Sequence, residues 1–118
     1  MSSKTTWLVE LQDRNQNSLP ISRMVDLSEL DAPITIEIGG DACCDLQVPR
    51  KLHVSFAARE FALTFSEKGV QFHNYQRPSK TNLNGQHVQQ MDIEAGLHEL
   101  KVGHERFSLR LARLTHPD

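Results

Sequence analysis

Histidine, cysteine and serine are the residue types in this chain whose side chains suit metal binding or nucleophilic attack. The histidines are dispersed, and none stands with cysteines or carboxylates at the spacing of a zinc site. Ser55 lacks the G-x-S-x-G context of an activated serine. We therefore predict a chain that is not an enzyme, holds no metal and no cofactor, and carries its histidines on the surface and on strand faces. The six histidines are His53, His73, His87, His98, His104 and His116.

The only cysteines are adjacent, Cys43 and Cys44. A disulfide between neighbours would close a small strained ring, so we predict two free thiols in a reducing cytoplasm. The alternative, a redox switch or a soft-metal site, lacks further sulfur ligands. The pair Gly39-Gly40 is not a phosphate loop either, since neither glycine pattern of such loops follows it.

Charge is unevenly spread along the chain. The net charge of −2 argues against nucleic-acid binding by the chain as a whole. Residues 1–39 carry −3, residues 40–87 carry +2 and residues 88–118 carry −1. The middle segment is thus the basic part of the chain. Its Lys and Arg residues are Arg50, Lys51, Arg59, Lys68, Arg77 and Lys80.

Length and composition describe one ordinary globular domain. The 118 residues suffice for a single core. No run approaches the roughly 18 apolar residues of a membrane span, and the first residues lack the apolar stretch of a secretory signal. Aromatic residues make up 6% and fall at predicted core positions, which leaves no stacking platform for single-stranded nucleic acid. We predict a single domain over 1–118, with its core at about 7–111 and loose ends.

Short alternating segments separated by turn residues indicate β-structure. Residues 7–11 and 19–24 are predicted to pair as a hairpin, and residues 26–33 to form an acidic surface loop or one helical turn ended by proline. A strand is expected at 34–38, because three isoleucines alternate there with polar residues. A brief strand follows at Leu46 and Val48.

The second half repeats this pattern. Phe61, Leu63 and Phe65 alternate on one face and are the best core candidates. A turn at 66–69 should join them to residues 70–73 as a hairpin, and a closing hairpin is expected at 97–111. Residues 89–96 are read as a connection, and no long run has helical periodicity. The sequence therefore predicts an all-β sandwich of about 9–11 mostly antiparallel strands.

The order of several short motifs resembles a forkhead-associated (FHA) domain, a β-sandwich whose loops at one end bind phosphothreonine peptides. The motifs are Gly39 after an apolar strand, Asp45-Leu46, Val54-Ser55, Thr81 to Gly85 with its Asn-Gly turn, and Val102-Gly103 near the end. No single motif is specific, and the resemblance rests on their order over roughly 7–111. It implies that Gly39, Asn84 and Gly85 are turn residues.

The resemblance fails at most phosphate-binding positions. Gly40 stands where the family has an arginine whose planar guanidinium hydrogen-bonds the phosphate oxygens. Ala58 stands where the family has a histidine that braces the loops. Counting back from Thr81 places Ser79 at the asparagine that holds the peptide backbone. Ser55 is the principal ligand retained. Losing one charged contact costs about 2–5 kcal/mol, so losing arginine, histidine and asparagine together should abolish family-style binding.

The resemblance therefore implies a non-enzymatic interaction or scaffold module for a protein or phosphopeptide partner, with phosphothreonine binding weakened or lost. It permits a bacterial secretion or signalling assembly in the cytoplasm. Self-association through an exposed sheet face is an open alternative. So is a phosphothreonine reader that uses a rearranged basic site of Arg50, Lys51, Ser55, Arg77 and Lys80. We favour the interpretation that these lysines and arginines are solvated loop charges and do not form such a site.

Phe56, beside Ser55, has two interpretations. It fills the space left by the missing polar cluster, which we favour, or it is an exposed anchor for a partner. The predicted partner-binding residues are Gly40, Arg50, Lys51, Ser55, Phe56, Arg77, Ser79, Lys80 and Asn82.

Overall fold

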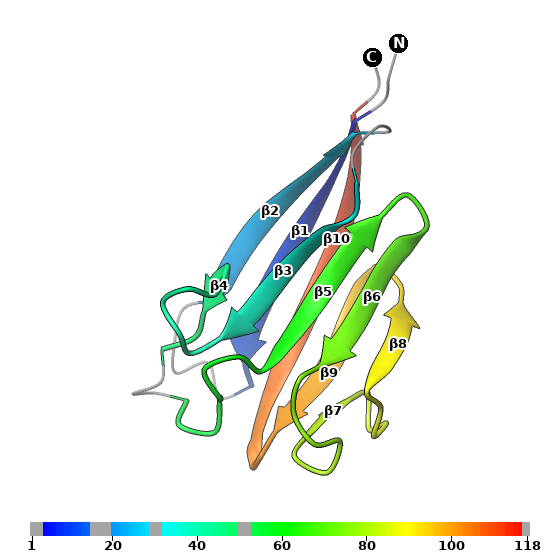
Figure 1. Cartoon of the computed structure of the whole chain (residues 1–118). Helices are drawn as coiled ribbons and strands as arrows, with labels where there is room; N and C mark the ends of the chain where they lie inside the picture. The colour runs from blue at the N-terminus through cyan, green and yellow to red at the C-terminus, as the bar shows by residue number, and fades with distance from the viewer. Residues whose placement is uncertain (1–3, 15–19, 29–31, 50–52, 117–118) are drawn as a thin grey trace.

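The computed structural model describes the whole chain except residues 1–3, 15–19, 29–31, 50–52 and 117–118. The described residues form ten strands in two five-stranded sheets, which face each other as a sandwich (Figure 1). The strands are β1 (Lys4–Asp13), β2 (Ile21–Ser28), β3 (Ile34–Gly39), β4 (Leu46–Gln47), β5 (Phe61–Ser66), β6 (Gly69–Asn74), β7 (Thr81–Leu83), β8 (Gln90–Ile93), β9 (Gly96–Val102) and β10 (Glu105–His116). The predicted all-β sandwich is confirmed.

The first sheet has the order β2-β1-β10-β9-β7 and is antiparallel throughout. Its centre is the long pairing of β1 with β10, which runs from Lys4 opposite His116 to Asp13 opposite Phe107. The predicted hairpin of β1 with β2 and the closing hairpin of β9 with β10 are both present.

The second sheet has the order β4-β3-β5-β6-β8. Its pairings are antiparallel except for that of β3 with β4, where Ile38 lies opposite Leu46. The β5–β6 hairpin pairs Phe61 with Asn74 and Phe65 with Val70, as the alternation predicted. No helix in the described part of the chain is long and apolar enough to cross a membrane.

The core lies between the sheets, where alternate side chains of each strand point inward. Phe61, Leu63 and Phe65 are fully buried, as predicted, and face residues of β1, β9 and β10 such as Trp7, whose ring centroid lies 5.7 Å from that of Phe65. The large residues that are completely enclosed include Phe72, Phe107, Ile38, Leu83, Leu100, Leu109 and Leu111.

Three predicted boundaries were wrong. Asp26 and Leu27 belong to β2, not to an acidic loop, because Leu27 is buried and the strand continues opposite Thr5. Residues 90–93 are not a mere connection but strand β8, which pairs with β6. The expected loose ends are also too wide, since β1 begins at Lys4 and β10 reaches His116.

The tight turn at Asn84-Gly85 is confirmed. Both residues have positive φ, 53° and 76°, which are the left-handed values that an Asn-Gly hairpin turn requires. Gly39 is not a turn residue, which corrects that prediction. It is the last residue of β3, and a Cβ there would lie 2.3 Å from the carbonyl oxygen of Ala58. This position needs glycine because another backbone segment passes against it.

Candidate functional site

We call the lower end of the sandwich in Figure 1 the loop end. It comprises residues 40–45, 48–60, 74–80 and 103–104. Of these, residues 50–52 lie outside the described part of the chain. Backbone hydrogen bonds join these loops. The Gly40 and Asp41 N–H groups donate to the carbonyls of Ala57 and Ala58 at 2.9 and 3.1 Å, and the Gly103 N–H donates to Lys80 at 2.8 Å. The loop end is therefore one connected structure.

Glu60 lies at the centre of the loop end and is completely buried. Its carboxylate accepts the Ala57 N–H at 2.7 Å, forms an ion pair with the Lys80 ammonium at 3.0 Å, and accepts a short hydrogen bond from the Thr81 hydroxyl. A buried carboxylate is strongly unfavourable unless it is paired and hydrogen-bonded. These three donors meet that need, and they tie residues 57–60 to residues 80–81.

A second buried cluster lies beside the first. One Glu105 oxygen contacts His53 Nδ1 at 2.8 Å, and the other accepts the Ser55 N–H at 3.3 Å. The far nitrogen of His53 lies 3.9 Å from an Asp13 oxygen, and its ring stands 5.1 Å from that of Phe107. The prediction of surface and strand-face histidines is wrong for His53, which is almost fully buried.

Phe56 is part of the core. It is 1% exposed, and its ring meets Phe107 edge to face with centroids 5.0 Å apart. The exposed-anchor interpretation is therefore wrong, and Phe56 does not belong among the partner-binding residues. A large apolar residue that is exposed in the described part of this loop is Val54, with 79% of its surface accessible, which the sequence analysis passed over.

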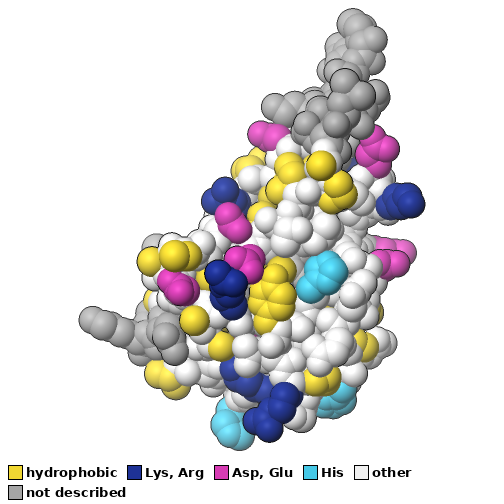
Figure 2. All heavy atoms as spheres, in the orientation of Figure 1, with side chains coloured by type: hydrophobic (Ala, Val, Ile, Leu, Met, Phe, Trp, Pro, Cys, Tyr) yellow, Lys and Arg dark blue, Asp and Glu magenta, His cyan; other side chains and the backbone are white. Residues whose placement is uncertain are grey.

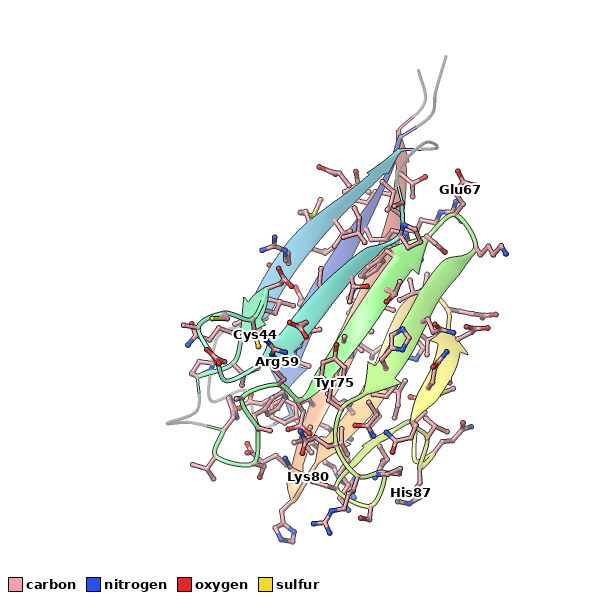
Figure 3. All side chains as sticks on the ribbon, viewed as in Figure 1. Cys44, Arg59, Glu67, Tyr75, Lys80 and His87 are labelled. Atoms are coloured by element: carbon pink, nitrogen blue, oxygen red, sulfur yellow. The ribbon has the colours of Figure 1, made fainter. Side chains whose placement is uncertain are left out.

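The basic residues of the middle segment do not form one site. Arg59 pairs with Glu37 at 3.8 Å on the outer face of the second sheet, where Figure 3 places it near Tyr75. Lys68 lies in the β5–β6 turn, far along the strands from the loop end. Lys80 is engaged with buried Glu60. Arg50 and Lys51 lie outside the described residues.

Arg77 and Ser79 are the predicted binding residues that remain exposed at the loop end. Figure 2 shows basic side chains at this end of the visible face, whereas the acidic side chains lie farther up, together with other basic ones. The Arg77 carbonyl accepts the N–H groups of Lys80 and Thr81 at 2.9 and 3.1 Å, so the turn is held by its backbone. Its guanidinium has no ion pair among the described residues.

Cys44 and Tyr75 also belong to the loop end (Figure 3). Cys43 is exposed and Cys44 buried, and both thiols are free. The Cys44 thiol donates to the Ala58 carbonyl at 3.1 Å, and burial raises its pKa. Burial raises the pKa of Tyr75 as well, helped by a hydrogen bond to Glu37. Among the described residues no group of histidine, cysteine and carboxylate side chains could hold a metal ion.

Comparison with solved structures identifies the architecture. An FHA domain studied for phosphothreonine-dependent interactions is 18% identical, with 94% of this chain and 99% of that one covered and a TM-score of 0.60. The FHA domain of the CT664 protein from Chlamydia trachomatis is 14% identical, with 89% and 96% covered and a TM-score of 0.62. The FhaA FHA domain, solved in complex with the intracellular domain of Rv3910, is 18% identical, with 86% and 99% covered and a TM-score of 0.59.

The chain has the fold of an FHA domain. No family model and no curated protein matches the sequence. Identities between 14% and 18% over nearly full-length matches describe a divergent FHA fold.

The loop bracing differs from what the FHA resemblance implied. The resemblance placed Ala58 where the family has a bracing histidine, and an alanine cannot brace the loops in that way. In the structure Glu60 makes the connection instead, through Lys80 and Thr81. Sequence reasoning missed it because Glu60 was read as part of an alternating strand over residues 59–65, with Phe61, Leu63 and Phe65 on its inner face. Alternation would then have turned Glu60 outward, but β5 begins only at Phe61.

The other predicted residues are dispersed. Gly40 has no side chain that could supply a cation, and its carbonyl accepts a hydrogen bond from the Gln47 side chain at 3.3 Å. The Ser55 backbone is held by Glu105. Asn82 lies in β7 and lines a groove on the outer face of the first sheet, together with Lys101 and Arg106. It is therefore not part of the loop end.

Proposed function

We propose that this FHA-fold chain is a non-enzymatic protein-interaction module that no longer binds phosphothreonine in the family manner. One observation carries the proposal: two carboxylates of the chain itself occupy donors of the loop end. Glu60 holds the Ala57 N–H and the Lys80 ammonium, and Glu105 faces the Ser55 N–H.

A phosphothreonine brings close to two negative charges and three acceptor oxygens, and it needs charge-assisted donors. At this loop end it would approach Glu105 beside Ser55, where like charges repel. To use Lys80 it would have to break the ion pair with Glu60 and leave a buried carboxylate uncompensated. Breaking such a pair costs about 3–5 kcal/mol, which is comparable to the gain from one good phosphate contact.

The solved FHA domains support the interaction role by analogy. One was studied for phosphothreonine-dependent interactions, and another was solved bound to the intracellular domain of a second protein. For this chain, the exposed described residues of the loop end include Val54, Tyr75, Arg77 and Ser79, a mixture of apolar and polar side chains suited to a protein partner. A cytoplasmic secretion or signalling assembly is the setting we propose for it.

One observation favours the alternative of a rearranged phosphothreonine reader. Arg77 is exposed and keeps its guanidinium without an ion pair among the described residues. A guanidinium can bind a phosphate with two parallel hydrogen bonds. Such a reader would rest on Arg77 alone among the described basic residues of the predicted set, because Lys80 is already paired.

Fluorescence anisotropy with a labelled phosphothreonine peptide pool separates the two. We expect no binding beyond that of the unphosphorylated pool, and no change in the variant Arg77→Glu. Lys68→Glu is the matched control, because it reverses an exposed charge at the other end of the sandwich. Phosphate-dependent binding that disappears in Arg77→Glu and persists in Lys68→Glu would refute the proposal and establish the reader.

A further inference from the structure

A polar groove of about 390 Å³ lies on the outer face of the first sheet, beside the loop end. We call it the β7–β9–β10 groove; it is lined by Asn82, Asn84, Gly85, His87, Glu99, Lys101 and Arg106. Its volume falls within the range of small ligand sites, roughly 300–1,000 Å³. His87, at its edge, is labelled in Figure 3 and contacts the Pro78 carbonyl through Nδ1 at 2.8 Å.

Strand pairing fixes the floor of the groove. Asn82 of β7 lies opposite Lys101 of β9, and Lys101 lies opposite Arg106 of β10. The three side chains therefore form a row across three strands on one face. The Asn84 turn supports one wall, because its N–H and its side-chain oxygen bind the Glu99 carbonyl and N–H at 2.7 and 2.8 Å.

Asn82 is the unusual member of this row. Only 8% of its surface is exposed, yet its side-chain amide makes no hydrogen bond to any described residue, and it faces the groove. Among the described residues no buried side-chain nitrogen or oxygen lacks a hydrogen-bond partner, so the unpaired amide atoms of Asn82 are open to the groove. An amide with free donors and a free acceptor, open to a groove that it lines, is available to hydrogen-bond a ligand there.

The charges around Asn82 indicate the sign of that ligand. Lys101 has no ion pair among the described residues, while Arg106 and Arg14 share the single carboxylate of Glu99 at 3.7 and 3.6 Å. Those two ion pairs are about half exposed and therefore weak. Positive charge exceeds negative charge here, although the chain as a whole is acidic.

We propose that the β7–β9–β10 groove binds an acidic segment of a partner protein, whose carboxylates face Lys101 and Arg106 and accept a hydrogen bond from the Asn82 amide. This surface extends the proposed interaction role beyond the loop end and involves none of its residues. A protein segment fits better than nucleic acid, because no Phe, Tyr or Trp lines the groove for base stacking and the chain carries a net charge of −2.

NMR titration of the whole ¹⁵N-labelled chain with a hexaglutamate peptide tests this proposal, with hexaglutamine as the uncharged probe. The side-chain NH₂ pair of Asn82 gives its own signals and reports the contact directly. We expect these signals and the Lys101 and Arg106 amides to shift with hexaglutamate and not with hexaglutamine. The affinity should fall as salt rises, because exposed charges are screened.

Variants locate the effect. Lys101→Gln should weaken hexaglutamate binding roughly three- to fivefold, whereas Lys68→Gln, which removes an exposed charge elsewhere, should not. Unchanged affinity in Lys101→Gln, or Asn82 signals that ignore hexaglutamate, would overturn the proposal. So would concentration-dependent Asn82 shifts without peptide, which would assign the groove to a second copy of this chain. A phosphothreonine peptide that shifts loop-end residues would refute the proposed function and leave the groove untouched.

Discussion

The loop end and the β7–β9–β10 groove lie side by side and both carry lysine and arginine, but they differ in what those cations face. At the loop end Lys80 is paired with a fully buried carboxylate, and backbone donors are taken by Glu60 and Glu105. In the groove, Lys101 and the Asn82 amide have no such partner among the described residues.

This difference shows that the number of basic residues in a segment does not decide where an anion can bind. What decides it is whether the protein already supplies the anion. A carboxylate enclosed beside a lysine is an internal ligand, and an external one must displace it at the cost of exposing a buried charge. Lys80, in the most basic segment of the sequence, is therefore less available to an external anion than Lys101.

The largest expected effect comes from removing the internal ligand of the loop end. Glu60→Ala leaves Lys80, the Ala57 N–H and the Thr81 hydroxyl without their shared acceptor. We expect the free energy of unfolding to fall by about 3–5 kcal/mol, measured by urea denaturation. If the protein is too unstable for that measurement, Glu60→Gln, which keeps the side-chain oxygen, should retain more stability than Glu60→Ala.

Glu99→Ala is the matched control in the groove. Glu99 is half exposed and its two arginine contacts exceed 3.5 Å, so its removal should cost less than about 1 kcal/mol. Equal losses in Glu60→Ala and Glu99→Ala would show that the two regions do not differ as described.

A smaller effect is expected in the thiol chemistry of the loop end. Cys44 is buried against the Ala58 carbonyl and its pKa is raised by burial, so at pH 8 less of it is the reactive thiolate. Iodoacetamide should modify Cys44 on the order of tenfold more slowly than exposed Cys43. Single variants Cys43→Ser and Cys44→Ser separate the two rates by mass spectrometry. Equal rates would mean that the loop around Ala58 opens readily.

Much of the fold was predictable because each strand buries one face, so that apolar and polar residues alternate along its sequence. Phe61, Leu63 and Phe65 marked β5 directly, and Asn84-Gly85 marked the tight turn. Strand β8 was missed because its only apolar residues are Met91 and Ile93, and two apolar residues are too few to reveal the alternation that marks a strand. Its existence depends on pairing with β6, which the local sequence does not encode.

The site was less predictable, since its interactions join residues distant in sequence. Glu60 meets Thr81 across 21 positions, and Glu105 meets His53 across 52. Asn82 was named for its place in a turn motif, yet its amide faces the opposite side of the sheet from the core. Burial of single polar side chains depends on where strands begin and end, and these boundaries are the least certain part of a sequence prediction.

The most direct test is a single ¹⁵N-labelled sample titrated first with the phosphothreonine peptide pool and then with hexaglutamate, while the amide signals of both regions are followed. We predict that Ser55, Ala57 and Arg77 stay in place throughout and that the Asn82 side-chain signals move only with hexaglutamate. Phosphate-dependent shifts of Ser55 and Ala57, with the Asn82 signals unmoved, would contradict the account, because the carboxylates of Glu60 and Glu105 would then not close the loop end to an external anion.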